Sequence, residues 1–292
     1  KIKKTKTLIR PISLIIALIF GYILSEYFYT FAKYSSYFLF AMLFLSMIRV
    51  DKFFHKDYAV ESILVVFLPL IFGGIFYTLL SLILKNNHQI LISAALIILS
   101  PLATTAVVMV KAINGNIAFA IMCIILSHFF TIIFWPIFSY LTSMKINCIE
   151  IAIKLSTMIL VPFIFSRIVR KTKAISVFAK IEHLGFYLWI VVVFINIASI
   201  SHLFKINQIH SNQINTMILI SFLMILINYF GGLFCSKHLK FQTEVRQLFI
   251  QRNTVFGIWI ANSFFTSEYA ICSIFYLIFQ NIYNTLKLIN SK

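Results

Sequence analysis

The chain has 292 residues, of which 61% are hydrophobic and only 11% are charged. This composition lies far from that of soluble domains and predicts an all-α polytopic membrane protein. The net charge is +17, and the basic residues that produce it lie mainly in short loops between apolar segments. The positive-inside rule accounts for such charges, so we do not expect nucleic-acid binding.

Ten segments are apolar and about as long as the 20 residues that a bilayer crossing takes. In chain order they are residues 8–25, 30–48, 59–83, 89–113, 117–142, 146–168, 183–202, 214–236, 244–265 and 268–289. The connections are short, so we expect one transmembrane domain over residues 1–292 and no soluble domain. The basic start of the first segment resembles a signal peptide, but Pro11 suits the first turn of a helix and no small-residue cleavage site follows, so a retained helix is expected.

The Lys and Arg residues predict the orientation. If the N-terminus is cytoplasmic, 19 of them fall on the inner side and four fall on the outer side, namely Lys33, Lys85, Lys145 and Lys205. The excess alternates loop by loop, as the positive-inside rule requires. We therefore expect a multi-pass protein of the cell (plasma) membrane with both termini in the cytoplasm.

The fourth segment contains a polar interruption. Ser100, Pro101, Thr104 and Thr105 lie in its middle, where a continuous lipid-facing helix would not place them. Pro101 removes one backbone donor and clashes with the preceding turn. The freed backbone groups cannot face hydrocarbon, so this break must be buried in protein or line a wet cavity. Interrupted helices at mid-depth are typical of the substrate or ion sites of transporters.

The ninth segment contains a second interruption, at Gln251, Arg252, Asn253 and Thr254. Ten segments divide into five plus five near residue 144, with a first repeat over about 8–142 and a second over about 146–289. Because five is odd, the second repeat enters the membrane in the opposite sense. This is the inverted-repeat plan of many secondary transporters, and it predicts that discontinuous helices 4 and 9 cross each other.

The chain resembles the bile acid:sodium symporter superfamily in order and spacing. The family has a Pro-containing break in its fourth span, a turn ending in Asn, and Pro near the ends of its fifth and sixth spans. The matching residues here are Pro101–Thr105, Ile113–Asn116, Trp135–Pro136, Pro162 with Arg167 and Arg170, Gly231–Gly232, Asn253 and Gln280–Ile282. The resemblance implies a ten-span transporter with a panel and a core.

The resemblance also implies two sodium ions bound by side-chain oxygens. The family's ligand positions fall here on Leu64, Ala106, Val107, Ala120, Ile124, Leu248 and Arg252. Sodium is a hard cation that takes oxygen ligands, which these side chains do not supply. Asn253 alone keeps the family's residue. We therefore expect no sodium coupling.

Arg252 is the most informative single residue. A centred Arg costs about 2.5–3.5 kcal/mol on insertion scales and normally faces the interior of a helix bundle with a partner. One interpretation is a tethered cation in place of sodium, facing an organic anion whose carboxylate suits the guanidinium fork. The other is a structural clamp on the carbonyls of the broken helix. Both interpretations stay open at this point.

The neighbouring polar residues have similar alternatives. Gln251, Asn253 and Thr254 line a substrate cavity or satisfy freed backbone groups. Thr104 and Thr105 offer hydroxyls to a solute or bond back to their own helix, and Ser100 is expected to satisfy a helix end. Two residues are candidates for proton coupling. Glu61 lies near the inner end of the third segment, and His128 in the fifth can titrate near neutral pH.

Catalytic and metal-binding patterns are missing. The sequence contains no HExxH, no GxSxG and no paired intramembrane Asp, so an enzyme is not expected. Cys123, Cys148, Cys235 and Cys272 are scattered without a CxxC pattern or a His at ligand spacing. We therefore expect neither disulfides nor a metal site, and no cofactor.

The predicted function is secondary transport of a small organic anion, held by Arg252, Asn253, Thr104 and Thr105 with Gln251 and Thr254 nearby, without sodium coupling. One alternative is a proton-coupled or uncoupled carrier of a neutral solute, with Arg252 purely structural. Another is a transport-inactive family member that acts as a receptor or scaffold. The expected partners are a small-molecule solute and the lipid bilayer.

Overall fold

The computed structural model describes residues 2–48, 56–85, 87–142, 147–181, 184–206 and 211–290. Every regular element in these ranges is a helix, and the one extended pairing is an isolated bridge between Leu102 and Arg252. The prediction of an all-α protein is therefore confirmed for the described part of the chain.

The first half of the chain contains α1 (Ile2–Ile23), α2 (Ser25–Phe28), the 3-10 turn η1 (Tyr29–Tyr34), α3 (Ser35–Met47), η2 (Lys56–Tyr58), α4 (Ala59–Ile83), α5 (His88–Ile98), α6 (Ala106–Ala112) and α7 (Ile117–Leu141). The second half contains α8 (Cys148–Arg170), α9 (Ile175–Ile181), α10 (Leu184–Lys205), α11 (Ser211–Ser236), α12 (Gln242–Ile250), α13 (Thr254–Phe264), η3 (Ser267–Ala270) and α14 (Ile271–Asn290).

Four of the described helices are long and apolar enough to cross a membrane, namely those within Lys56–Ile83, Ile117–Leu141, Ile149–Arg170 and Gln213–Ser236. Ile15–Ile23 and Ser25–Leu45 form a fifth span if they are counted together, although they are bent by 86°. Shorter apolar helices lie at His88–Ile98, Tyr187–His202 and Thr254–Phe264. A multi-pass membrane protein is thus confirmed, whereas the count of ten spans stays a prediction.

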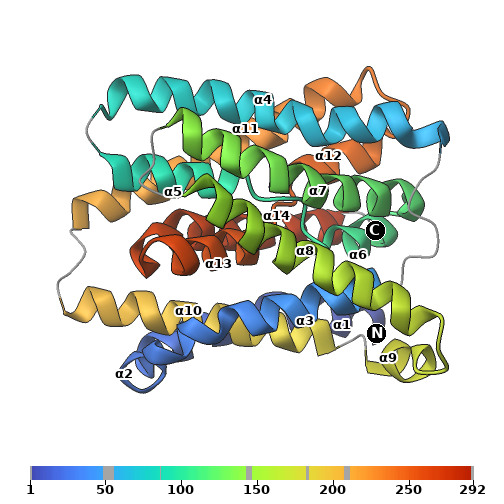
Figure 1. The fold of residues 1–292 in the computed structure, drawn as a ribbon, viewed down its shortest axis with the longest axis horizontal. Coiled ribbons are helices and arrows are strands. Elements are labelled where there is room, and N and C mark those ends of the chain that lie inside the picture. Colours follow the sequence, from blue (N-terminus) through green and yellow to red (C-terminus); the bar gives the residue numbers. More distant parts are fainter. Residues whose placement is uncertain are drawn as a thin grey trace.

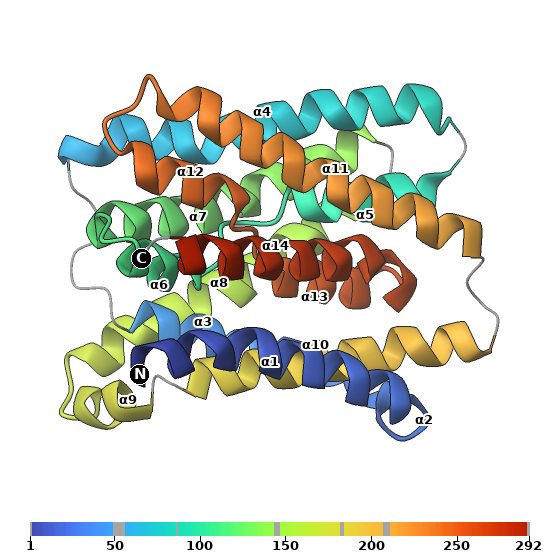
Figure 2. The same ribbon diagram turned by 180° about the vertical axis from the view of Figure 1, so that it is seen from behind.

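The helices form three layers (Figures 1 and 2). One outer layer contains α1, α3 and α10, in which α10 packs on both α1 and α3. The opposite layer contains α4 and α11, which are also in contact. The interrupted pairs α5/α6 and α12/α13 lie between these layers with α7 and α14. The breaks are therefore placed in the middle of the molecule, away from both outer faces.

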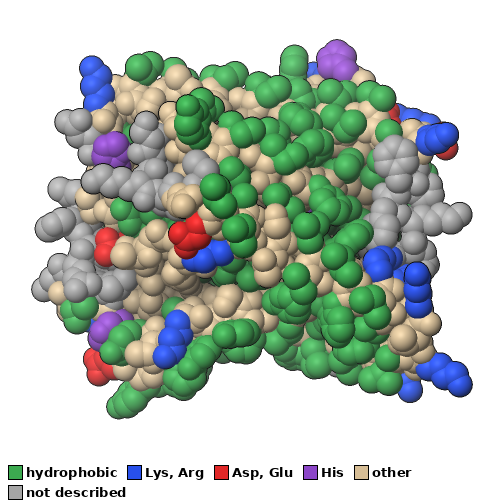
Figure 3. Space-filling view, in the orientation of Figure 1, with side chains coloured by type: hydrophobic (Ala, Val, Ile, Leu, Met, Phe, Trp, Pro, Cys, Tyr) green, Lys and Arg blue, Asp and Glu red, His purple; other side chains and the backbone are tan. Residues whose placement is uncertain are grey.

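Both ends of the chain lie at the same end of the molecule in Figure 1. Lys and Arg side chains gather over this end, around α9 (Figure 3). Here Arg170 at the end of α8 donates from Nη1 to the carbonyl of Ile48 at 2.8 Å, and Arg167 donates to the carbonyl of Met47. These cations thus meet the negative end of α3. Of the residues counted for the orientation, Lys1, Arg49, Lys52, Lys145 and Lys292 lie outside the described residues.

Candidate functional site

The two helix interruptions meet each other. The segment between α5 and α6 runs antiparallel to the segment between α12 and α13. The amide of Ala103 donates to the carbonyl of Gln251 at 3.0 Å, and the amide of Asn253 donates to the carbonyl of Pro101 at 2.8 Å. Two breaks about 150 positions apart in the sequence therefore satisfy part of each other's backbone. We call this contact the crossing.

Side chains from other helices satisfy more of the freed backbone groups. The hydroxyl of Ser127 on α7 accepts from the amide of Leu102 at 2.9 Å, and Oε1 of Gln280 on α14 accepts from the amide of Arg252 at 2.9 Å. The hydroxyl of Tyr276 donates to the carbonyl of Ile250 at 2.8 Å. Backbone without helical bonds is tolerated at membrane depth only when protein or a wet cavity covers it. The crossing is covered by protein, which is one of the two environments that the sequence predicts for it.

Arg252 is buried at the crossing, with only 3% of its surface exposed. Its Nη1 donates to the carbonyl of Ser100 at 3.3 Å, just beyond the C-terminal end of α5, where a cation is favourable. Nε and Nη2 have no hydrogen-bond partner among the described residues. No carboxylate in this part of the chain pairs with the guanidinium. In this arrangement the guanidinium therefore contacts one backbone carbonyl and has two nitrogens, Nε and Nη2, that donate to no described residue.

Gln251 belongs to a cluster of amides that joins the crossing to α14. Its Nε2 donates to Oδ1 of Asn284 at 2.5 Å, and its Oε1 accepts from Gln280 at 3.2 Å and from Asn284 at 3.4 Å. Gln247 also donates to Asn284, at 2.9 Å. We call these four residues the amide cluster. Because Gln251 is used within it, its side chain braces the break in this arrangement.

Asn253 and Ser100 also satisfy helix ends. Oδ1 of Asn253 accepts from the amide of Phe256 at 3.2 Å and caps α13, while the hydroxyl of Ser100 donates to the carbonyl of Leu96 at 2.5 Å. Thr254 is buried, and Thr104 and Thr105 are half-buried in the turn before α6. The hydroxyls of these three threonines have no hydrogen-bond partner among the described residues. The hydrogen bonds of this arrangement therefore do not use these three hydroxyls.

A cavity of about 10 Å³ adjoins the crossing. Its polar lining comes from Ser100, Ser127, Thr131 and Arg252. This volume has room for about one water molecule. The cavity is too small for a solute of several heavy atoms in this arrangement.

The positions that the resemblance assigns to sodium ligands are mostly apolar and packed together. Ala106, Ala120, Ile124 and Leu248 are buried in one hydrophobic cluster, and Val107 packs against it. Leu64 instead is 37% exposed, so it does not face this cluster. The cluster offers methyl groups where a sodium ion takes oxygens.

Neither candidate for proton coupling hydrogen-bonds Arg252 among the described residues. His128 on α7 is fully buried, its Nδ1 lies 2.8 Å from the carbonyl of Ile124, and its Nε2 has no partner among the described residues. One carboxylate oxygen of Glu61 accepts from the amide of Lys240 at 3.0 Å, in the turn before α12. Arg252 follows the opposite end of α12, so Glu61 and the guanidinium lie at opposite ends of this helix.

Several residues of the site were not recognised as such from the sequence. Tyr276, Gln280 and Asn284 are spaced four apart on α14, so they share one helical face, and this spacing was the available signal. Glu244 at the start of α12 is 8% exposed and accepts from the amide of Asn116 at 2.5 Å. It holds the turn between α6 and α7, in which Asn114 has a φ of 57°.

The sequence model of the SBF-like CPA transporter family matches residues 56–287, which is more than half of the chain and includes both interruptions. The chain belongs to the SBF-like CPA transporter family. This confirms the resemblance to the bile acid:sodium symporter superfamily. The SBF-like family is one of membrane transporters, in keeping with the expectation that the protein is not an enzyme. A comparison with curated proteins finds no match for this SBF-like chain.

Proposed function

We propose that this protein is a secondary transporter of small organic anions and that it works without sodium coupling. The observation that carries the proposal is the buried guanidinium of Arg252, which has two unused donors and no carboxylate partner among the described residues. A buried charge that lacks a partner is strongly unfavourable. A carboxylate offers two oxygens to the planar fork of Arg and supplies the missing charge.

The lack of sodium coupling has two supports. The positions of the family's sodium ligands form an apolar cluster. In addition, the guanidinium already donates to the carbonyl of Ser100 beyond the end of α5, and such helix ends attract cations in broken transporter helices. The guanidinium of Arg252 then supplies permanently the positive charge that a coupled sodium ion would supply only while it is bound. Its second role is to attract the anion when the site opens.

The proposed architecture is ten spans in two inverted repeats, residues 8–142 and 146–289. It is supported by one broken helix in each half, α5/α6 and α12/α13, and by the antiparallel pairing of the two breaks. We propose that the α1–α3–α10 layer moves against the rest of the molecule and opens the crossing to either side in turn. Both termini face the cytoplasm of the plasma membrane in this proposal, because both lie at the end where Lys and Arg gather (Figures 1 and 3).

The solute contacts follow from which polar groups are free. In the opened site the carboxylate pairs with Arg252, and the hydroxyls of Thr104, Thr105 and Thr254 bind the remaining polar atoms. Asn253 and Gln251 hold the backbone around the solute through their cap and amide contacts.

A second candidate function is transport of a neutral solute, with or without protons. The contact between Arg252 and the Ser100 carbonyl favours it, because a clamp has a structural use that needs no anion. The unpartnered Nε2 of His128 and the carboxylate of Glu61 are the proton-coupling candidates in that case.

Uptake by purified protein in liposomes tests the proposal. The liposomes contain potassium salts only, and labelled monocarboxylates and dicarboxylates are supplied outside. We expect saturable uptake of at least one carboxylate that a sodium gradient does not change. Uptake only with an inward sodium gradient contradicts the absence of coupling. Uptake of neutral solutes that carboxylates do not inhibit favours the second candidate, and no flux under any gradient indicates a receptor or scaffold.

A further inference from the structure

The small cavity beside Arg252 has an outer wall. Of the residues that line it, Leu70, Phe130 and Phe134 are partly exposed, whereas the others are buried. Leu70 belongs to α4 and the two phenylalanines belong to α7, and these helices are in contact. We call the contact of α4 with α7 at these residues the seam. Because the cavity holds about one water molecule, a gap of that size lies between Arg252 and the side chains of the seam.

Three aromatic rings close the seam. Phe67 on α4 lies 4.8 Å from Phe130 and 5.5 Å from Phe134, measured between ring centroids. The rings of Phe130 and Phe134 are 5.9 Å apart, and Phe67 is partly exposed like the other two. A phenylalanine side chain has no polar atom. The rings can therefore turn aside without leaving a hydrogen-bonding group unpaired.

The outer surface of the seam is apolar. Ile71 on α4 and Ile133 and Ile137 on α7 are exposed. Figure 3 shows hydrophobic side chains gathered over α4 and α7, which lie toward the viewer in Figure 1. Both helices are among those that are long and apolar enough to cross a membrane. The seam thus faces the hydrocarbon of the bilayer rather than water.

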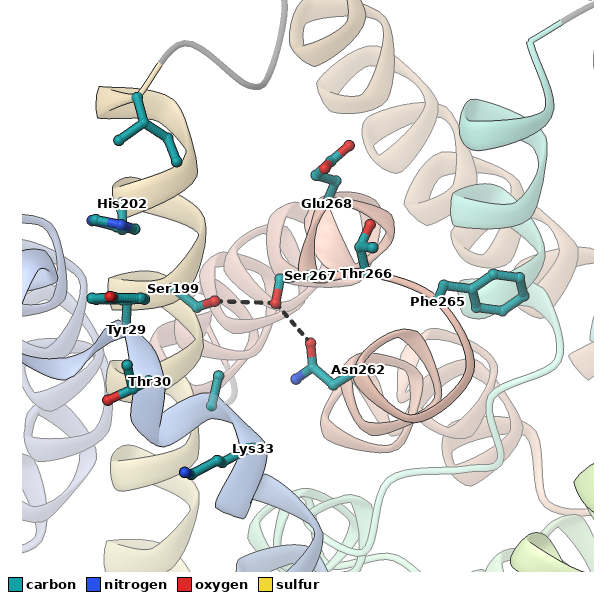
Figure 4. A pocket seen from close by; sticks show the side chains of 12 residues that line it. Tyr29, Thr30, Lys33, Ser199, His202, Asn262, Phe265, Thr266, Ser267 and Glu268 are labelled. Carbon is teal, nitrogen blue, oxygen red and sulfur yellow. Dashed lines mark hydrogen bonds between the residues drawn. The ribbon is translucent and has the colours of Figure 1, made fainter.

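A larger pocket of about 520 Å³ lies elsewhere, between η1 and α10 on one side and the end of α13 and η3 on the other (Figure 4). Its lining includes neither Arg252 nor any other residue of the two breaks. The hydroxyl of Ser199 donates to Ser267 at 3.0 Å, and Ser267 donates to Oδ1 of Asn262 at 3.1 Å, so hydrogen bonds join its walls. Parting these walls breaks those bonds, whereas turning the rings of the seam aside breaks none.

We propose that the seam is a side entrance from the bilayer to Arg252 and that its ligand is a fatty acid, a carboxylate on a single long apolar chain. The carboxylate meets the guanidinium, whose Nε and Nη2 donate to no described residue. The chain stays between the rings of the seam and the surrounding lipid, where it remains out of water. A small hydrophilic carboxylate does not dissolve in hydrocarbon, so it does not reach this entrance.

This inference rests on the proposed function, because it uses the same pairing of a carboxylate with Arg252. It narrows the substrate class to carboxylates that dissolve in the bilayer. The residues that line the cavity come from α4, α7 and the two breaks with the end of α5, and none of them belongs to α1, α3 or α10. The entrance is thus on the side of the crossing away from the layer that moves in the proposed cycle. Loading through the seam and release past that layer are separate steps.

The test is photolabelling of the purified protein in lipid nanodiscs of neutral phosphatidylcholine. The probe is palmitic acid with a diazirine in the middle of its chain, and mass spectrometry identifies the labelled peptides. We expect labelling of α4 and α7 around Phe67 and Phe130, which an excess of palmitate suppresses. Hexadecanol lacks the carboxylate and acetate lacks the chain. Each should compete about tenfold more weakly or worse, which corresponds to about 1.4 kcal/mol.

Variants then assign the gate and the charge. Phe130→Ala should raise the initial rate of labelling about threefold or more, because a side chain that covers a site limits entry to it. Phe129→Ala is the matched control, since Phe129 is also partly exposed but packs against Phe163 of α8, at 5.5 Å between centroids, and does not line the cavity. It should label at the parent's rate. Arg252→Gln should remove the advantage of palmitate over hexadecanol. Thermal denaturation shows whether each variant is folded.

The inference is overturned if the probe labels neither α4 nor α7, if hexadecanol competes as well as palmitate, or if folded Phe130→Ala is labelled at the parent's rate. Its failure is distinguishable from failure of the proposed function. Uptake of short carboxylates that depends on Arg252, without labelling at the seam, removes the side entrance alone. Labelling at the seam that palmitate suppresses, without uptake of any carboxylate, removes the transport proposal alone.

Discussion

Arg252→Leu is expected to abolish carboxylate uptake in liposomes. The substitution removes the only cation that the described residues place at the crossing, where the surroundings are buried. Losing one partner of a buried charge pair costs about 2–5 kcal/mol, which corresponds to a loss of roughly 30-fold or more in binding. Arg252→Lys should keep part of the activity, because it retains the charge but not the planar fork. Initial uptake rates per folded protein measure both effects.

The control for this prediction is Arg246→Gln. Arg246 lies on α12, one and a half turns before the crossing, and its Nε donates to the hydroxyl of Ser236 at 2.9 Å. Loss of this side chain should leave the uptake rate within about twofold of the parent's rate. Exposed and partly buried contacts of charged groups contribute little free energy. Since replacing a buried charge by an apolar group can stabilise a protein, folding of Arg252→Leu is checked separately. Undiminished uptake by a folded Arg252→Leu protein contradicts the anion proposal.

Gly257→Ala is expected to lower the free energy of unfolding by about 1–3 kcal/mol, the usual cost of overpacking a tight core. A Cβ atom at Gly257 of α13 meets the hydroxyl of Ser273 at 2.7 Å, the hydroxyl of Ser100 at 3.0 Å and the carbonyl of Leu96 at 3.1 Å. The carbonyl belongs to the backbone of α5 and moves only with the whole helix. The extra methyl group therefore pushes α13 away from α5 just beside the crossing.

Gly74→Ala is the matched control, because Gly74 is also in a helix and a Cβ atom there meets nothing within 4 Å. Removing a helical glycine without strain should leave stability unchanged or raise it by up to about 1 kcal/mol. Denaturant titration in lipid–detergent micelles compares the two variants. Equal stability of both would show that α5 and α13 are not closely packed at Gly257.

Local sequence signals were enough to find the two breaks. Pro101 and the polar runs around Thr104 and Arg252 cannot continue a lipid-facing helix, so both interruptions could be placed from the sequence. The long apolar segments were equally clear, and the segment predicted at 59–83 coincides with α4. The segment predicted at 30–48 begins later as a helix, because residues 29–34 form the 3-10 turn η1.

The partners of the breaks depend on tertiary packing that no local pattern indicates. Gln251 and Asn253 look free in the sequence, yet the amide cluster and the cap on α13 use both. Ser127 and Gln280 come from other helices and satisfy single backbone amides. The larger pocket between η1, α10 and η3 is harder still, because η1 and η3 lie in opposite halves of the chain and only the folded chain brings them together.

A sodium titration tests the central claim most directly. The apparent melting temperature of the purified protein is measured with sodium replacing potassium at constant ionic strength, for the parent and for Arg252→Gln. An ion that binds only to the folded protein raises the apparent stability of that protein. The increase is about 2.7 kcal/mol when the ion concentration is 100 times the dissociation constant. We predict that the parent melts at the same temperature in both salts. If sodium raises the melting temperature of Arg252→Gln but not that of the parent, the result supports the proposal that the guanidinium occupies the place of a sodium ion. A rise in the parent with sodium contradicts the account, because the protein then has a working sodium site and Arg252 does not replace it.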